Sequence, residues 1–349
     1  MDSSREPFRR VLVAGGAGFI GSHFARYLLA RSLAEVVVLD KLTYAGNLAN
    51  LTDLSDSPRF RFVHADICDV DAVEAALTGC DAIVNFAAET HVDRSLLDPS
   101  AFIQTNVYGT WTLLESARRA GVRRYVQVST DEVYGDVETG LSSEDDPLRP
   151  RSPYSASKAG ADLMVLSYVA AHGLDASITR GSNTYGPYQY PEKVIPLMIT
   201  HAMEDRPLPV YGDGRQIRDW IHVADHCSGI ATVLERGQPG EVYNVGGGNP
   251  RENLDVIRTI LRLLDRPESL LQHVKDRLAH DRRYALATDK LRGLGWEPAV
   301  AFDDGLRDTV AWYHARRDWW EPLRDADFRD YYQRNYGGRA ARDADVPRA

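Results

Sequence analysis

Cysteines, long apolar runs and excess positive charge are all scarce in this sequence of 349 residues. The three cysteines, Cys68, Cys80 and Cys227, form no CxxC pair, so neither a disulfide framework nor a structural metal site is indicated. No run of about 18 apolar residues is available to cross a membrane. The N-terminus lacks the apolar core of a signal peptide. We therefore expect a cytoplasmic protein without a metal.

Basic residues are outnumbered, since 41 Lys and Arg face 50 Asp and Glu and the net charge is -9. This balance argues against sequence-independent binding of nucleic acid, which relies on cations that neutralise phosphates. A local basic pocket could still hold a small anionic substrate. With 44% hydrophobic and 26% charged residues, the composition is globular, and the length suggests two domains or one domain with a large appendage.

From Arg10 to about Thr179, short apolar runs alternate with helical stretches. The runs are VLVAG, VVVLD, FRFVHAD, DAIVNFA, RRYVQVS and DASITR, and the helical stretches include Gly18 to Arg31 and Phe102 to Ala120. Continuous β-rich runs joined by helices are typical of a parallel sheet that is covered on both faces. The first half is therefore predicted to be a doubly wound α/β domain.

A glycine array follows the first predicted strand. In VLVAGGAGFIGSH, Gly15, Gly18 and Gly21 lie between that strand and a helix. Such glycines allow a tight turn, close approach of a pyrophosphate and packing of helix on strand. Asp40 ends the second strand, where a carboxylate can accept the adenosine-ribose hydroxyls and repel a 2'-phosphate, so NAD is favoured over NADP. The alternative role for Asp40 is a strand-end cap.

Further cofactor contacts are expected at the ends of later strands, where ligands of this fold bind. Asp66 and Ile67 end the third strand and Phe86 to Ala88 the fourth, although either could be simple packing. The full predicted cofactor set is Gly15, Gly18, Phe19, Ile20, Gly21, Asp40, Lys41, Leu42, Thr43, Asp66, Ile67, Phe86, Ala87, Ala88, Thr105, Tyr154 and Lys158.

The predicted domain boundary lies at about Tyr185, where the alternation of apolar runs and helices gives way to connections rich in Pro, Gly and Tyr. Residues 8–185 are predicted to form a Rossmann-like NAD-binding domain, and 219–250 are a candidate to pack back on it. Residues 186–325, rich in Pro, Gly and Tyr connections, are predicted to form a smaller substrate-binding lobe. The polar tail, 326–349, is expected to be partly disordered.

The segment SPYSASK places Tyr154 and Lys158 four residues apart on one face of a predicted helix. A nearby ammonium, together with a positively charged nicotinamide ring, favours the phenolate of Tyr154, which could then accept a hydroxyl proton as hydride leaves the same carbon. Thr130 could orient that hydroxyl. The alternative is an ordinary surface pair.

The segment VSTDEVYG sets two carboxylates, Asp131 and Glu132, side by side after a strand. Neighbours on a strand point to opposite faces, so both acids can serve one site only if the backbone leaves strand geometry at about Thr130. A solvated loop start is the alternative reading.

The GxxGxxG array, the YxxxK pair and STDEVYG together resemble the extended short-chain dehydrogenase/reductase family, and within it the branch that removes water from dTDP-glucose. The likeness runs from Arg10 to about Trp320 and includes DKLTYAGN, AAETHVDRS, NTYGPYQYPEK, GDGRQIRDWIHVADHC and HDRRYA. Sibling enzymes remain as alternatives: decarboxylases of this family usually have serine at the position of Asp131, and UDP-sugar 4-epimerases lack the acid pair. A non-catalytic NAD(H) sensor is a third reading, but it would have no use for these side chains.

The resemblance implies an NAD-dependent cycle in which C4 of the sugar is oxidised, water is lost across C5 and C6, and hydride returns to C6 to give a 4-keto-6-deoxy sugar. It assigns Thr130, Asp131, Glu132, Tyr154 and Lys158 to catalysis, with Glu132 as the C5 base and Asp131 as the acid for the 6-hydroxyl. The implied substrate-binding residues are Thr90, Asn183, Lys193, Val194, Pro209, Tyr211, Arg218, Asn253, Arg277 and His280.

Two departures from the family pattern concern the substrate side. Thr184 stands where a second Asn is usual, and Leu278-Ala279 replace a usual Pro-Gly. The resemblance also implies a homodimer through the helices Pro99 to Ala120 and Tyr154 to His172. Both helices carry apolar residues beyond one buried face, namely Val107, Trp111, Leu114, Leu163, Leu166 and Tyr168.

Overall fold

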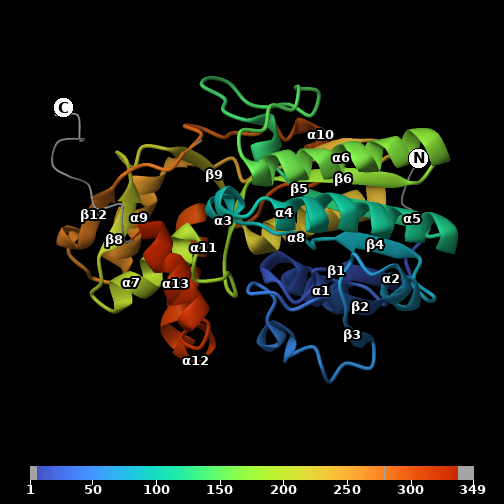
Figure 1. Cartoon of the computed structure of the whole chain (residues 1–349), viewed down its shortest axis with the longest axis horizontal. Helices are drawn as coiled ribbons and strands as arrows, with labels where there is room; N and C mark the ends of the chain where they lie inside the picture. The colour runs from blue at the N-terminus through green and yellow to red at the C-terminus, as the bar shows by residue number, and fades with distance from the viewer. Residues whose placement is uncertain (1–5, 279, 337–349) are drawn as a thin grey trace.

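A seven-stranded parallel sheet forms the centre of the computed structural model, which describes residues 6–278 and 280–336. The strand order is β10-β6-β5-β4-β1-β2-β3, and all six neighbouring pairs are parallel (Figure 1). The strands are β1 (Arg10–Ala14), β2 (Glu35–Asp40), β3 (Phe60–His64), β4 (Ala82–Asn85), β5 (Arg124–Thr130), β6 (Ala176–Gly181) and β10 (Val242–Val245). The predicted doubly wound α/β fold is confirmed.

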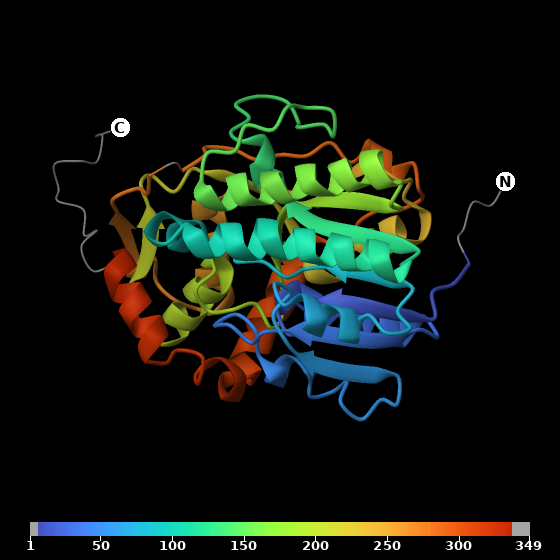
Figure 2. The same cartoon turned by 45° about the vertical axis from the view of Figure 1, so that its right-hand side comes forward.

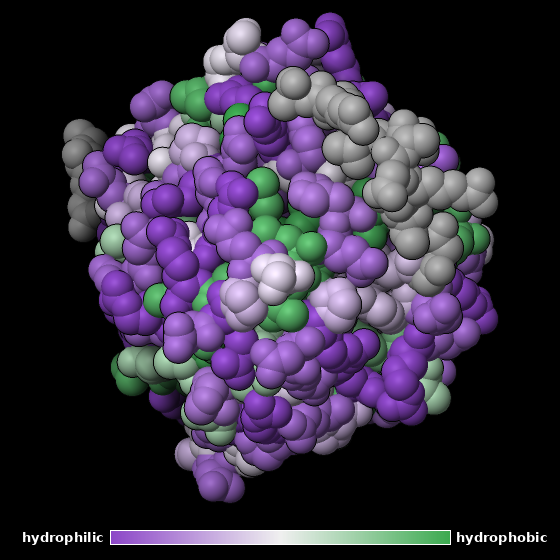
Figure 3. Space-filling model, turned by 90° about the vertical axis from the view of Figure 1, so that its left-hand side faces the viewer, coloured by the Kyte–Doolittle hydropathy of each residue, from purple (hydrophilic) through white to green (hydrophobic). Residues whose placement is uncertain are grey.

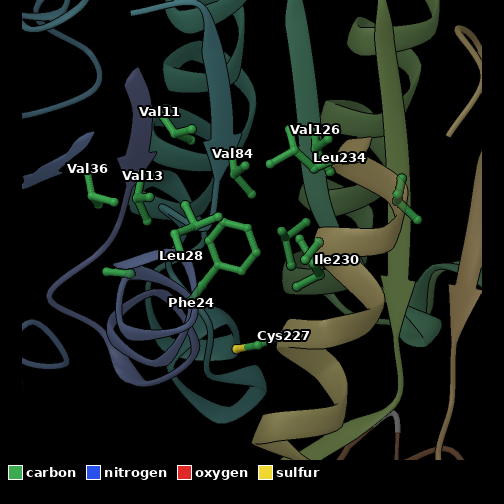
Figure 4. Close-up of a cluster of buried hydrophobic side chains, with 14 of the residues drawn as sticks. Val11, Val13, Phe24, Leu28, Val36, Val84, Val126, Cys227, Ile230 and Leu234 are labelled. Carbon is green, nitrogen blue, oxygen red and sulfur yellow. The ribbon is translucent and has the colours of Figure 1, made fainter. Parts of the chain in front are cut away.

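Helices cover both faces of this sheet because successive strand residues point to opposite sides. On one face, α1 (Phe19–Arg31) and α8 (Val223–Arg236) pack against valines of β1, β2, β4 and β5 (Figure 4). On the other face lie α2 (Val70–Ala76), α5 (Thr110–Ala120) and α6 (Pro153–His172). The short α4 (Ser100–Phe102) and the π-helical η2 (Ile103–Gly109) lead into α5.

The sheet reverses its order between β1 and β4, since the chain winds outward to β3 on one side and to β6 on the other. The carboxyl ends of β1 and β4 therefore open a crevice, the place where ligands of such sheets bind. The seventh strand, β10, and helix α8 both come from residues 219–250, so this segment packs on the first domain although it follows the substrate-lobe residues in sequence.

The smaller lobe lies beyond the carboxyl ends of the strands (Figure 1). Its helices are α7 (Val194–Met203), α9 (Asn253–Leu263), η4 (Glu268–Leu270), α11 (Phe302–Ala315), α12 (Arg317–Trp320) and α13 (Ala326–Tyr336). Two small sheets complete it: β7 (Asn183–Tyr185), β9 (Ile217–His222) and β11 (Pro250–Glu252) form one, and β8 (Leu208–Tyr211) pairs with β12 (Leu271–Val274). The face seen in Figure 3 is mostly hydrophilic, with a small group of hydrophobic side chains near its centre and others scattered around it.

Short elements connect these layers: η1 (Leu48–Leu51), α3 (Val92–Leu97), η3 (Asp131–Tyr134) and α10 (Asp289–Arg292). None of the helices within residues 6–278 and 280–336 is long and apolar enough to cross a membrane.

The polar tail, predicted to be partly disordered, begins with a helix, α13, whose Phe328 and Tyr331 are buried in the lobe. The remaining tail residues, 337–349, lie outside the described residues.

Two of the apolar residues on the predicted dimer helices are not available to a partner. Leu114 and Tyr168 are buried in the chain's own core, where they pack with residues of the central sheet.

Candidate active site

A cavity opens at the carboxyl edge of the central sheet, between the two lobes. Its lining includes residues that follow β1, β2, β4, β5 and β6, the N-terminal half of α6 and the loop before α7. Of the predicted cofactor residues, all except Leu42 and Asp66 line it, as do all five predicted catalytic residues. Among the described residues, no group of three or more His, Cys, Asp or Glu side chains could hold a metal ion.

The glycine turn brings backbone close to backbone at the floor of the cavity. Gly15 has φ +73°, and a Cβ there would lie 2.5 Å from the backbone N of Ala87. At Gly21, a Cβ would lie 2.3 Å from the carbonyl oxygen of Gly15. Gly18 is the N-cap of α1, whose first N–H groups have no intrahelical partner. The turn therefore presents a narrow, donor-rich bed that fits a pyrophosphate.

Asp40 lines the cavity at the end of β2 and is buried. One carboxylate oxygen accepts from the backbone N of Ala17 at 3.0 Å and the other from that of Leu42 at 2.8 Å. Burial raises the pKa of Asp40, while these donors oppose the rise. Asp40 can therefore cap the strand end and also accept the ribose hydroxyls, because each carboxylate oxygen has a second lone pair free to accept another hydrogen bond.

Leu42 and Asp66 lie outside the cavity lining. Leu42 packs against the core of the first domain. Asp66 accepts from the backbone N of Cys68 at 2.9 Å and lies 3.5 Å from Nζ of Lys41. Lys41 also donates to Oγ1 of Thr105 at 3.0 Å. Lys41 and Thr105 both line the cavity, and Asp66 contacts Lys41 from outside the lining.

Tyr154 and Lys158 stand one turn apart near the start of α6. The helix begins at Pro153 because Ser152 forms a capping box with Ser155. Lys158 donates from Nζ to the carbonyl oxygen of Val128 at 2.6 Å, and burial lowers its pKa to about 8.

The pKa of Tyr154 is raised by its protein surroundings alone. Burial, the largest cause, and the carboxylate of Glu132 hold it above its ordinary value, while the neighbouring Thr130 hydroxyl opposes the rise. The cost of burying the Tyr154 phenolate decides the direction of the pKa shift. The Lys158 ammonium donates to the backbone of β5. Only added positive charge at this spot, such as a nicotinium ring, would reverse that balance.

The two acids do enter one site, because β5 ends at Thr130 and Asp131 begins the 3₁₀ turn η3. Thr130 caps that turn and its hydroxyl donates to Oδ1 of Asp131 at 3.2 Å. The pKa of Asp131 is raised well above its ordinary value by burial and then by the charge of Glu132. Burial also raises the pKa of Glu132, but Arg277, Arg218 and Lys193 oppose that rise. Asp131 is therefore the acid of the pair that more readily holds a proton, because the three cations act against protonation of Glu132.

Three cations act on Glu132, of which Arg218 is buried and Lys193 and Arg277 are half-buried. Lys193 donates from Nζ to the carbonyl oxygen of Thr90 at 2.9 Å, and Arg218 donates to the carbonyl oxygen of Asp281 at 2.8 Å. Arg277 lies 3.8 Å from the Asp93 carboxylate. Among the described residues, no carboxylate lies within 4.0 Å of the Arg218 guanidinium. Three cations of this kind suit a multiply charged anion.

The predicted substrate-binding residues fall into two groups. Thr90, Asn183 and Lys193 line the cavity. Beyond the acid pair, in the smaller lobe, lie Val194 at the start of α7, Pro209 and Tyr211 on β8, Arg218 on β9, Asn253 at the start of α9, and Arg277 and His280 after β12. The Tyr211 and His280 rings are in edge contact at 5.8 Å between centroids.

Helix α13 supplies residues that the sequence analysis missed. Tyr336 stacks on Tyr211 with centroids 5.6 Å apart, and Asn335 donates to the Tyr211 hydroxyl oxygen at 2.8 Å and to Asp93 at 3.3 Å. The spacing of Tyr332, Asn335 and Tyr336 on one helical face was a usable signal. The polar residues between them, Gln333 and Arg334, concealed it.

The two departures from the family pattern, Thr184 and Leu278-Ala279, lie in different places. Thr184 lines the cavity, and its Oγ1 lies 2.7 Å from Nδ1 of His226. His226 also lines the cavity, although the sequence analysis did not single it out. The pKa of His226 is lowered to about 4 by burial. Leu278 is exposed, and Ala279 lies outside the described residues.

Comparison with known proteins agrees with this geometry. The family model described as GDP-mannose 4,6 dehydratase matches residues 12–309, and the chain belongs to this family of extended short-chain dehydrogenase/reductase enzymes. Within the family, the chain is similar to dTDP-glucose 4,6-dehydratases. One from Actinoplanes sp. is 50% identical over 318 residues, covering 89% of this chain and 99% of the relative.

Solved structures point the same way. A dTDP-glucose 4,6-dehydratase from Streptomyces venezuelae, with NAD and TYD bound, is 53% identical with a TM-score of 0.89, covering 90% of this chain and 99% of that one. A UDP-glucose 4-epimerase from Thermus thermophilus in complex with NAD is 33% identical with a TM-score of 0.82, covering 88% and 99%. The fold is thus shared with the rival enzyme, whereas the identity favours the dehydratase.

Proposed function

We propose that the chain catalyses the NAD-dependent dehydration of dTDP-glucose to dTDP-4-keto-6-deoxyglucose, a step of deoxysugar biosynthesis. The observation that carries this is the placement of Asp131, Glu132, Tyr154 and Lys158 around one cavity beside the glycine turn. The names of its relatives, which are dTDP-glucose 4,6-dehydratases at about half identity, support the same substrate.

The first domain is proposed to hold NAD. The glycine turn and the first turn of α1 fit a pyrophosphate, and Asp40 fits an unphosphorylated ribose. When bound, NAD accepts hydride from C4 and later supplies it to C6. Tyr154 takes the proton of the 4-hydroxyl, Lys158 supplies positive charge on the same helical face, and Thr130 orients the hydroxyl.

Elimination is proposed to use the acid pair. Oxidation at C4 makes the C5 proton acidic, and Glu132, ionised among three cations, removes it. Asp131, kept neutral by burial and by its neighbour, protonates the departing 6-hydroxyl. Neither acid can replace the other, because they face different electrostatic surroundings.

The smaller lobe, residues 186–325, is proposed to hold the nucleotide. Lys193, Arg218 and Arg277 would bind the diphosphate, since paired cationic donors match its charge and geometry. Tyr211, packed between His280 and Tyr336, marks the nucleoside end. Thr90, Asn183, Val194, Pro209, Asn253 and His280 complete the proposed contacts. The proposed setting is the cytoplasm.

NAD is expected to stay with the protein through purification, because it is regenerated in each cycle and need not leave. Denaturing the purified protein should release NAD(H) at close to one equivalent per chain. A supernatant that contains NADP instead, or no dinucleotide, would contradict the assignment of Asp40.

A homodimer is proposed through η2, α5 and α6, which lie side by side at the front of Figure 2. Ile103, Tyr108 and Leu163 are exposed there by 55%, 41% and 58%, an apolar surface that a second copy would cover. Leu163→Arg should convert the dimer to a monomer in light scattering at micromolar concentration. Leu33→Arg, at a leucine on another surface that is exposed by 95%, should not. A monomeric parent would refute the proposal.

Incubation with dTDP-glucose and, separately, UDP-glucose tests the function directly. Mass measurement should find loss of one water from dTDP-glucose. A new isomer of unchanged mass, resolved from the substrate by chromatography, would indicate an epimerase. Loss of carbon dioxide in a separate incubation with a nucleotide-sugar acid would indicate a decarboxylase, and no turnover of any of these substrates a sensor.

A further inference from the structure

A buried ion pair lies directly behind Lys158. Helix α6 places Tyr154, Lys158 and Asp162 at successive i, i+4 positions on one face. Asp162 is fully buried, and its Oδ2 accepts from Nε of Arg180 on β6 at 2.9 Å. The helical face thus carries the proposed proton acceptor, its ammonium partner and then a carboxylate, in that order.

Arg180 is held from its other side as well. Its guanidinium donates to the hydroxyl oxygen of Tyr134 at 2.9 Å, and that hydroxyl donates to Oδ1 of Asn244 at 2.8 Å. Asn244 in turn donates to the carbonyl oxygens of Ser142 and Ala287. Arg180 is therefore held by Tyr134, which Asn244 of β10 and the loops beside it keep in place.

The charges around Lys158 come from three elements. On α6 they are Tyr154 and Asp162. From β5, Val128 supplies the carbonyl oxygen that accepts from Nζ, and the Ser129 hydroxyl lies beside Asp162. Arg180 of β6 lies on the far side of Asp162. The acids of η3, Asp131 and Glu132, act on Tyr154.

Burial disfavours the Lys158 ammonium, and Asp162 is the charge that opposes this. The lowered pKa of Lys158, about 8, leaves the ammonium only a narrow margin at neutral pH. Loss of the Asp162 charge would remove the opposing interaction and leave Arg180 as an unbalanced buried cation. Both changes lower the pKa of Lys158 further.

We propose that Asp162 is a positioning residue of the reaction: its carboxylate, oriented by Arg180, keeps the Lys158 ammonium charged and so sets the alkaline limit of C4 oxidation. This inference rests on the proposed function, because it needs the Tyr154 and Lys158 pair to act on the sugar. Asp162 itself touches neither substrate nor cofactor.

The test is the pH profile of kcat/KM for dTDP-glucose in the parent and in Asp162→Asn. The parent should lose activity above about pH 8, as Lys158 loses its proton. In the variant, this alkaline limb should move down by about one pH unit, which is about a fivefold loss at pH 8 and little loss below about pH 6. Asp162→Glu and Arg180→Lys keep the charges, so the alkaline limb of their kcat/KM profiles should stay at the pH of the parent.

An equal loss of activity at every pH would mean that Asp162 only supports the fold, and it would overturn the inference. If Asp162→Asn does not fold, Asp162→Ser carries the same expectation, since it is smaller and equally neutral. A parent with no dehydratase activity at any pH would overturn the proposed function and this inference with it, whereas an active parent and an unmoved limb would overturn the inference alone.

Discussion

Replacing Asp131 by Asn should stop the reaction between its two hydride transfers. The amide cannot protonate the 6-hydroxyl, but Tyr154 and Lys158 remain to oxidise C4. Reduced cofactor should therefore accumulate on the protein after dTDP-glucose is added, visible by its absorbance. Overall dehydration should fall roughly 10²-fold or more, as positioned acids typically contribute 10² to 10⁴.

Glu132→Gln provides the matched comparison within the acid pair. It removes the proposed C5 base, so exchange of the C5 proton with solvent deuterium should slow together with turnover. If Asp131→Asn dehydrates dTDP-glucose at nearly the parent rate, the two carboxylates are a structural feature of the η3 turn. The proposed roles would then be wrong.

Tyr154→Phe should block the first step, with a loss of roughly 10²-fold or more. Without the phenolic oxygen there is no acceptor for the 4-hydroxyl proton, so no reduced cofactor should accumulate. This outcome separates the variant from Asp131→Asn, although both are nearly inactive. Stopped-flow absorbance after mixing with dTDP-glucose measures the difference.

Tyr27→Phe is a suitable control for that experiment, because Tyr27 lies on α1 and stacks on Phe24. It should reduce the cofactor at the parent rate. Rapid accumulation of reduced cofactor in Tyr154→Phe would show that another group accepts the proton, and Tyr154 would lose its assigned role.

Much of the cofactor side could be predicted from sequence because it depends on local pattern. The glycine turn, the strand-end Asp40 and the Tyr154 and Lys158 pair each lie within one strand, turn or helix, where spacing fixes geometry. The end of strand geometry at Thr130 could also be predicted from the sequence, because Asp131 and Glu132 can enter one site only if the strand ends there.

The remainder depends on contacts between distant segments. No local pattern reveals that Arg218 and Arg277 lie against Glu132, or that α13 returns to place Tyr336 on Tyr211. The sequence predicts that an ammonium and a bound nicotinamide ring together favour the Tyr154 phenolate. Burial in the protein alone raises the pKa of Tyr154, and the depth of burial is a tertiary property that residue spacing does not encode.

The most direct test of the central claim follows the hydrogen atom at C4. dTDP-glucose carrying deuterium at C4 should give a product with that deuterium at C6, because hydride leaves C4 and returns within the same active site. Mass spectrometry and deuterium NMR of the product locate the label. Deuterium retained at C4, as an epimerase would leave it, or lost to solvent, would contradict the account.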